Sequence, residues 1–305
     1  MLSPGDRYTM MVPSDKCAID SVGTHAVSDQ QSAPIERGAG TNDRPVNEQM
    51  DDAVLREDNG GAVILTLHAP AFRNACSVEM REALLDHLRD ASQDSACRYV
   101  VLTGSSGHFC SGGRLKADAK PDPERTRRNV SVLQDIVRLL HGGPKPSLAA
   151  VEGFAFGAGF SLAMACDYVV AAQGARFCAS FGKVGLMADA GLCWTLPQRV
   201  GAARARDLLL TAREVRDEEA LQIGLVDQLV TTGEALQHAL QAGERYGATA
   251  PLSLAATKRV LDGKSSLDAV LAAEAIEQPM LTLSEDYAEG RAAFREKRAP
   301  VFRGL

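Results

Sequence analysis

A glycine-rich segment, Gly153–Asp167, has residue types and spacing that could stabilise negative charge. It follows an apolar run typical of a strand, Ser147–Val151, and leads into a helical pattern, Phe160–Ala165. Backbone N–H groups at such a helix N-terminus point at one place, where the helix dipole favours negative charge. An anion, or an oxygen that becomes one during a reaction, could bind there. The glycines could instead only allow a close strand-to-helix approach.

A second glycine-rich turn, Gly104–Lys116, follows Tyr99–Thr103, an apolar run that suits a strand buried on both faces. Neither turn continues into the Gly-Lys-Ser/Thr of a phosphate-binding loop, and neither has the spacing of a dinucleotide fingerprint. The sequence therefore argues against nucleotide hydrolysis and hydride transfer. Two such turns could each offer one backbone N–H to the same oxygen.

Strand and helix patterns alternate through the first part of the chain, which predicts an α/β fold with the turns after the strands on one edge. The strand pattern Ala62–Leu67 precedes a helix that Ser77 would cap. A further helix is expected over Asp122–Leu140, and further strands over Tyr168–Ala172 and near Phe177. Later helical patterns cover residues 203–210, 217–222, 234–246, 252–261 and 267–287.

Three segments are expected. Residues 1–52 contain few large apolar residues and no helical or strand period, so we expect a disordered N-terminal extension without the features of a targeting segment. Residues 53–200 should form the α/β core, and residues 201–305 a helical C-terminal region.

The composition is that of an ordinary globular protein of 305 residues, 45% of them hydrophobic. A net charge of -6 argues against nucleic acid or a membrane surface as the main partner. Seven cysteines, an odd number, lie partly inside apolar segments and lack metal-ligand spacing. We therefore expect reduced thiols, no metal and a cytoplasmic location.

The order of motifs resembles the crotonase (enoyl-CoA hydratase/isomerase) superfamily. The resemblance rests on residues 100–104 with 109–113, 151–153 with 157–159, Cys166-Asp167, 185–186, 189–191, 196–197, 224–227 and 294–298. It implies a crotonase-like spiral of ββα units with a helical C-terminal trimerisation region, assembled as a homotrimer or homohexamer. It also implies an acyl-CoA thioester substrate, with coenzyme A as part of the substrate and no separate cofactor.

The resemblance places the thioester oxygen between two backbone N–H groups, those of Ser111 and Ala158. Each such donor is typically worth about 10² to 10³ in rate. The positions that would contact coenzyme A or line the thioester are Arg73, Ala75, Ser111, Gly112, Gly113, Arg114, Phe294 and Lys297. The basic residues among them could instead be solvated surface charges, and Phe294 could be a core residue.

One acid matches a catalytic position of the superfamily. Ser161 and Phe181 stand where family hydratases have two glutamates, whereas Asp189 matches the acid of several family isomerases. Apolar neighbours such as Leu186 and Met187 should desolvate the Asp189 carboxyl and raise its pKa. Asp189 could alternatively cap the helix expected to begin after it.

These residues predict an enoyl-CoA isomerase that moves a β,γ double bond to the α,β position, with Asp189 as the acid/base. A single carboxylate is enough for that proton transfer. Two alternatives remain: an enoyl-CoA hydratase or hydrolase acting through Asp189 and a water molecule, and a non-catalytic acyl-CoA-binding scaffold.

Overall fold

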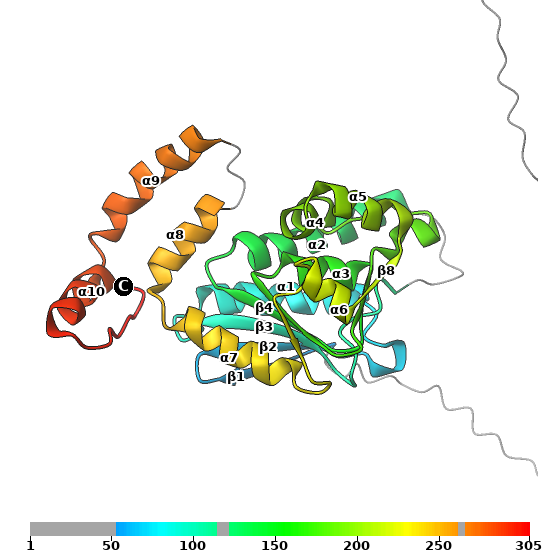
Figure 1. Cartoon of the computed structure of the whole chain (residues 1–305), viewed down its shortest axis with the longest axis horizontal. Coiled ribbons are helices and arrows are strands. Elements are labelled where there is room, and N and C mark those ends of the chain that lie inside the picture. The colour runs from blue at the N-terminus through cyan, green and yellow to red at the C-terminus, as the bar shows by residue number, and fades with distance from the viewer. Residues whose placement is uncertain (1–52, 115–121, 262–265) are drawn as a thin grey trace, which may run out of the picture. The chain divides into compact units, whose positions relative to one another are not determined.

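The computed structural model describes residues 53–114, 122–261 and 266–305, which all belong to one compact unit. The predicted disordered extension lies outside these residues. In the described part, six strands form one sheet in the order β1-β2-β3-β4-β6-β9, and β1 alone is antiparallel to its neighbour (Figure 1). Their bounds are Val54–Asn59, Ala62–Leu67, Tyr99–Gly104, Ser147–Val151, Tyr168–Ala172 and Gln228–Val230.

A smaller sheet of the described residues has the order β5-β7-β8. Its strands are Phe154–Phe156, Arg176–Cys178 and Glu214–Arg216. The helices are α1 Val78–Gln93, α2 Pro123–Gly142, α3 Ala158–Ala165, α4 Leu192–Val200, α5 Ala202–Thr211, α6 Asp217–Gln222, α7 Ala235–Gly247, α8 Pro251–Leu261, α9 Leu267–Leu281 and α10 Glu285–Glu296.

Helices cover both faces of the main sheet. Successive strand side chains point to opposite faces, so Val101 packs in the cluster that includes Ala239 of α7, whereas Leu102 packs in the cluster with α1, α2 and α3. Helix α7 packs closely against strand β3. A Cβ on Gly243 would lie 2.1 Å from the Tyr99 ring, so this approach requires glycine. This two-sided burial explains why the strands are continuous apolar runs.

Most elements expected from the sequence are confirmed, including strands β2, β3, β4, β6 and β7. Ser77 caps α1, since its Oγ accepts a hydrogen bond from the Met80 amide at 3.2 Å. The pattern 267–287, however, is two helices, because Ser284 caps α10 through a bond from the Tyr287 amide at 3.1 Å. Residues beyond 200 also contribute strands β8 and β9 to the two sheets.

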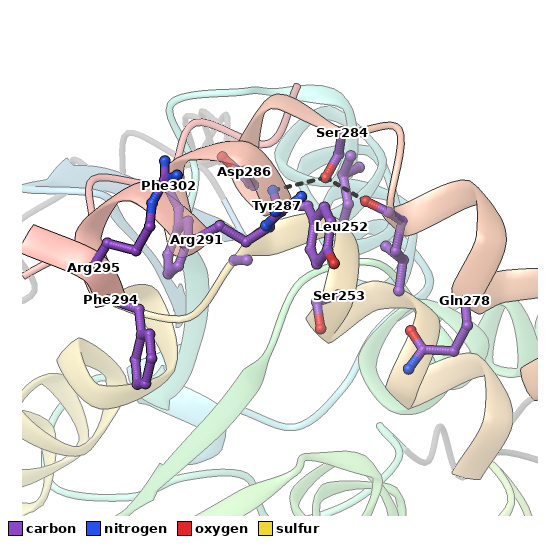
Figure 2. Close-up of a pocket in the computed structure, with 13 residues that line it drawn as sticks. Leu252, Ser253, Gln278, Ser284, Asp286, Tyr287, Arg291, Phe294, Arg295 and Phe302 are labelled. Carbon is purple, nitrogen blue, oxygen red and sulfur yellow. Dashed lines mark hydrogen bonds between the residues drawn. The ribbon is translucent and has the colours of Figure 1, made fainter.

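The C-terminal helices carry uncovered apolar surface. None of the residues of α9 is buried, and Leu267, Ile276 and Met280 are all exposed. Residues of helices α8, α9 and α10, among them Tyr287 and Phe294 of α10, line an open pocket of about 550 Å³ (Figure 2). In the described part of the chain no helix is both long and apolar enough to cross a membrane. The six cysteines described there are free thiols.

A buried ion pair joins helix α8 to the main sheet. The ammonium of Lys258 contacts Asp167 Oδ2 and also donates to the carbonyls of Leu140 and Lys145, at 3.0 and 3.1 Å. Asp167 Oδ2 further accepts a bond from the Ser147 amide at 2.8 Å. Asp167 therefore braces strand β4 and helix α8.

Replacing Lys258 with methionine should lower the free energy of unfolding by about 3 kcal/mol, because it leaves a largely buried carboxylate without its cation. Urea denaturation measures this loss. The matched control is Arg259→Met on the same helix, whose ion pair with Glu277 is half exposed and should be worth less than about 1 kcal/mol. Equal losses in the two variants would contradict the bracing role of Asp167.

Candidate functional site

The two glycine turns lie against each other. The Cys110 backbone pairs with Ala155 of β5, since its amide donates to Phe154 O at 2.8 Å and its carbonyl accepts from the Phe156 amide at 2.9 Å. Helix α3 then packs on the first turn so closely that a Cβ on Gly159 would lie 2.6 Å from the Cβ of Cys110. Only a glycine fits there, and this close approach brings the two predicted sources of backbone donors together.

Ser111 is not a free donor in this structure. Its amide donates to the Arg73 carbonyl at 3.1 Å, and its hydroxyl donates to the Phe72 carbonyl at 3.0 Å. Both groups therefore hold the segment before α1 in place. The expected role of the Ser111 amide as a donor to the thioester oxygen stays a prediction.

Gly113 offers the amide that Ser111 does not. The Gly112 carbonyl accepts from the Cys76 amide at 2.7 Å, and the Arg114 amide donates to the Cys76 carbonyl at 3.3 Å. In this parallel bridge the N–H of the intervening Gly113 points away from Cys76. The Gly113 amide has no acceptor among the described residues.

Ala158 offers the second amide. It is the first residue of α3 and follows Gly157, whose φ of 49° is left-handed and suits glycine. The first N–H groups of a helix have no partner within the helix, and the Ala158 amide has no acceptor in the part of the chain described here. Ala158 can therefore donate, as expected from the sequence.

The Asp189 loop is attached to the same helix. The Ser161 hydroxyl, fully buried on α3, donates to the Asp189 carbonyl at 3.0 Å. Ala190 and Gly191 follow with φ values of 47° and 72°, both left-handed. A non-glycine residue in that region is strained, and such strain is common at functional sites. Ser161 thus fixes the loop that carries the acid.

The Asp189 carboxyl does not cap helix α4. The N-cap residue is Gly191, and no side chain caps this helix. Instead, Asp189 Oδ1 is buried and has no hydrogen-bond partner among the described residues. This leaves the capping alternative without support and the carboxyl free for another role.

Burial raises the pKa of Asp189, and the nearby Arg81 guanidinium opposes this with a smaller lowering effect. The expected rise in the pKa is confirmed, but two of the residues expected to cause it do not. Leu186 and Met187 are 56% and 78% exposed and do not shield the carboxyl. A raised pKa makes the carboxylate a stronger base near neutral pH.

Arg81 is a site residue that the sequence reasoning missed. It lies in the first turn of α1, and its Nη2 donates to the Cys76 carbonyl at 3.3 Å. The same nitrogen would lie 3.6 Å from a Cβ on Gly113. The pattern that could have revealed it is its spacing from Leu84 and Leu88, which puts a charge on the apolar stripe of the helix.

The predicted coenzyme A contacts fall into two groups. Arg73, with a φ of 51°, and Arg114, whose guanidinium lies 3.9 Å from the centroid of the Phe72 ring, both adjoin the first glycine turn. Ala75 is nearly buried beside them. Phe294 lies instead on α10, by the pocket of Figure 2, and Lys297 is the residue that follows this helix. Among the described residues, neither contacts the glycine turns. Their role stays a prediction.

Comparisons with known proteins assign the family. The chain matches the enoyl-CoA hydratase/isomerase family over residues 57–304. It is 38% identical to a probable enoyl-CoA hydratase of Rhodobacter capsulatus, over 81% of this chain and 96% of that protein. It is 35% identical to the 1,2-epoxyphenylacetyl-CoA isomerase of Escherichia coli, over 84% of this chain and 100% of that protein.

A solved structure agrees. The crystal structure of an enoyl-CoA hydratase from Polaromonas sp. JS666 superposes with a TM-score of 0.77 at 36% identity, covering 82% of this chain and 99% of that one. The chain belongs to the enoyl-CoA hydratase/isomerase family, the crotonase superfamily, and has its fold. Assembly as a homotrimer or homohexamer stays a prediction.

Replacing Asp189 with asparagine should stabilise the protein at neutral pH, because a carboxyl whose folded pKa is raised is penalised when it ionises. The folded state binds more protons than the unfolded state at pH values above the ordinary pKa of 3.8, so stability falls as pH rises through this window. The gain in unfolding free energy in Asp189→Asn should therefore be small at pH 3.8 and larger at pH 7. The control is Asp86→Asn, whose side chain is 73% exposed. A gain that does not grow with pH would contradict burial of the charge.

Proposed function

We propose that this protein is an enoyl-CoA isomerase that shifts a β,γ double bond to the α,β position. The observation that carries the proposal is the single desolvated carboxyl of Asp189. Its loop is held by helix α3, and the amide of Ala158, the first residue of that helix, is free to donate. Ser161 makes this connection through its bond to the Asp189 carbonyl. The match to a relative named as an isomerase supports the same class of reaction.

The proposed reaction needs only one proton carrier. The Asp189 carboxylate removes a proton from the carbon between the thioester carbonyl and the double bond. The electron pair of that C–H bond moves toward the carbonyl, giving a dienolate whose oxygen carries the negative charge. Asp189 then returns the proton to the γ-carbon, and the double bond is left between the α- and β-carbons. Atoms and charge balance without water.

The dienolate oxygen would be held by two backbone amides, those of Gly113 and Ala158. Gly113 replaces Ser111 in this proposal because the Ser111 amide is already bonded to the Arg73 carbonyl. Donors fixed by the fold stabilise the charge without reorganising during the reaction. The thioester and pantetheine would then run along Gly112, Gly113 and Arg114.

Hydration by a pair of glutamates is disfavoured, because Ser161 and Phe181 occupy the two glutamate positions. Ser161 is fully buried and bonded to the Asp189 loop, and Phe181, 7% exposed, has no proton to exchange. Hydration or hydrolysis through Asp189 and one water molecule remains the second candidate. The relative named as a probable hydratase supports it.

The Asp189→Asn variant should lose isomerase turnover by about 10² to 10⁴-fold, because asparagine cannot carry a proton. The measurement is conversion of β,γ-enoyl-CoA thioesters, followed by the absorbance of the conjugated product, with Asp86→Asn as the control for removing a carboxylate from the chain. Equal rates in wild type and Asp189→Asn would remove Asp189 from the mechanism. Hydration of crotonyl-CoA without isomerisation would favour the second candidate.

The Ala158→Pro variant should lose about 10² to 10³-fold in turnover, because it removes one backbone donor. Proline is well tolerated at the first residue of a helix, so α3 should remain intact. Ala202→Pro makes the same change at the first residue of α5, which also follows a glycine and lies outside the proposed site. Circular dichroism checks folding of both. Full activity in a folded Ala158→Pro protein would contradict the proposed oxyanion hole.

A further inference from the structure

Asn74 is a fully buried polar residue to which the proposed reaction gives no role. It is 0% exposed and lies in segment 69–76, between strand β2 and helix α1. Its φ of 57° is left-handed, a conformation that asparagine adopts more easily than most residues. Buried polar side chains in folded proteins are almost always hydrogen-bonded. The partners of the Asn74 carboxamide therefore indicate what this residue does.

The Asn74 carboxamide makes four hydrogen bonds, which occupy both of its donors and both lone pairs of its oxygen. Its Nδ2 donates to the carbonyls of Ser105 and His108, at 2.8 and 2.7 Å. Its Oδ1 accepts from the Ser105 hydroxyl and from the Ala69 amide, both at 3.0 Å. Three of the four bonds go to the first glycine turn, so this side chain joins segment 69–76 to that turn.

Two residues beyond Asn74, the same segment holds the part of the turn that carries the proposed donor. The Cys76 amide donates to the Gly112 carbonyl at 2.7 Å, and the Cys76 carbonyl accepts from the Arg114 amide at 3.3 Å. These two bonds lie on either side of Gly113. The position of the Gly113 amide therefore depends on where segment 69–76 lies.

The part of the turn that Asn74 contacts is attached to the second glycine turn. A Cβ on Gly104 would lie 2.1 Å from the His108 carbonyl oxygen, so the first turn folds tightly on itself. The Phe109 amide then donates to the Glu152 carbonyl at 2.8 Å. Residue 152 precedes strand β5 and helix α3, whose first residue is Ala158. This end of the first turn is thus fixed relative to the Ala158 amide.

We propose that Asn74 is a positioning residue for the oxyanion hole. Its carboxamide connects the segment that holds Gly113 to the part of the turn that is fixed relative to Ala158. It thereby sets the distance between the two donor amides without itself reaching the substrate. This inference rests on the proposed function, because that function assigns these two amides to the thioester oxygen.

The geometry of the four bonds selects a carboxamide. An aspartate at position 74 could keep the two acceptor bonds and tolerates the same left-handed backbone. It would, however, place an oxygen against the Ser105 and His108 carbonyl oxygens, where Nδ2 now donates. The Asn74→Asp variant therefore removes the donors while changing the size of the side chain very little.

The test measures how strongly the protein polarises a thioester carbonyl. Butyryl-CoA labelled with ¹³C at that carbonyl is bound to the purified full-length protein, and infrared difference spectroscopy records the carbonyl stretch. Wild type should lower the stretching frequency relative to free butyryl-CoA, because two donors weaken the C=O bond. Asn74→Asp should lose about half of this shift, since one of the two donors is misplaced. Its isomerase kcat should fall about 10²-fold, with a smaller change in KM.

Three further variants separate positioning from folding. Ser105→Ala removes one of the four bonds and should lose a smaller part of the shift, and it decides the question if Asn74→Asp does not fold. Lys258→Met also disrupts a buried polar group, but at the ion pair of α8. Asn59→Asp makes the same substitution at an exposed residue of β1. Both Lys258→Met and Asn59→Asp should keep the full shift.

A full wild-type shift in folded Asn74→Asp would overturn the proposal, and so would a full shift in Ser105→Ala. An equal loss of shift in Lys258→Met would also overturn it, because lost stability would then explain the effect. Failure of the proposed function is distinguishable, since it appears as absent isomerase turnover in a wild type that still lowers the carbonyl frequency. A wild type that leaves the frequency unchanged would overturn both.

Discussion

The close contact between the two glycine turns is the constraint on which the site depends. Helix α3 can approach the first turn only because Gly159 has no side chain, since a Cβ there would meet Cys110 at 2.6 Å. That approach sets the position of the Ala158 amide relative to the first turn. It also fixes Ser161, one turn further along α3, whose hydroxyl holds the Asp189 carbonyl. The Ala158 amide therefore lies on the same helix that holds the Asp189 loop.

Two opposing effects act on the Asp189 carboxyl. Burial raises its pKa, which strengthens the base, whereas the charge of Arg81 opposes part of that rise. A base needs both properties, because it must be ionised to accept a proton and basic enough to remove one. In the proposed reaction, negative charge moves from Asp189 to the thioester oxygen. Arg81, whose Nη2 would lie 3.6 Å from a Cβ on Gly113, would keep a positive charge close to that movement.

The fold could be predicted from the sequence where the patterns are local. Buried strands such as Tyr99–Gly104 appear as apolar runs, and Ser77 marks its helix because capping involves only neighbouring residues. Strand β1 was missed because it lies at the edge of the sheet. Its residues Arg56–Asn59 are all polar, so the strand shows no clear alternation of apolar and polar residues. The break between α9 and α10 was missed because the apolar pattern continues across it.

The site could be predicted only in part. Motif order predicts roles for Asp189 and Ala158. Which amide of the first turn is free, however, depends on the pairing of that turn with Cys76 and on the bond between Ser111 and Arg73. Arg81 could not be assigned a role either, because its neighbour Asp189 is 108 positions away in the sequence. Contacts between distant segments decide both questions, and neither composition nor periodicity encodes them.

The location of the acid on a loop rather than on α3 has a physical consequence. A carboxylate at position 161 would lie in the first turns of α3, where the helix dipole favours the ionised form and lowers the pKa. It would also compete with the substrate oxygen for the charge-stabilising end of that helix. With Ser161 there instead, the dipole would act on the thioester oxygen alone in the proposed site. In the proposed site the Asp189 loop, strained at Ala190, would then supply a base whose pKa burial has raised. This separation of the base from the oxyanion donors suits a reaction in which one carboxyl must take up a proton and return it.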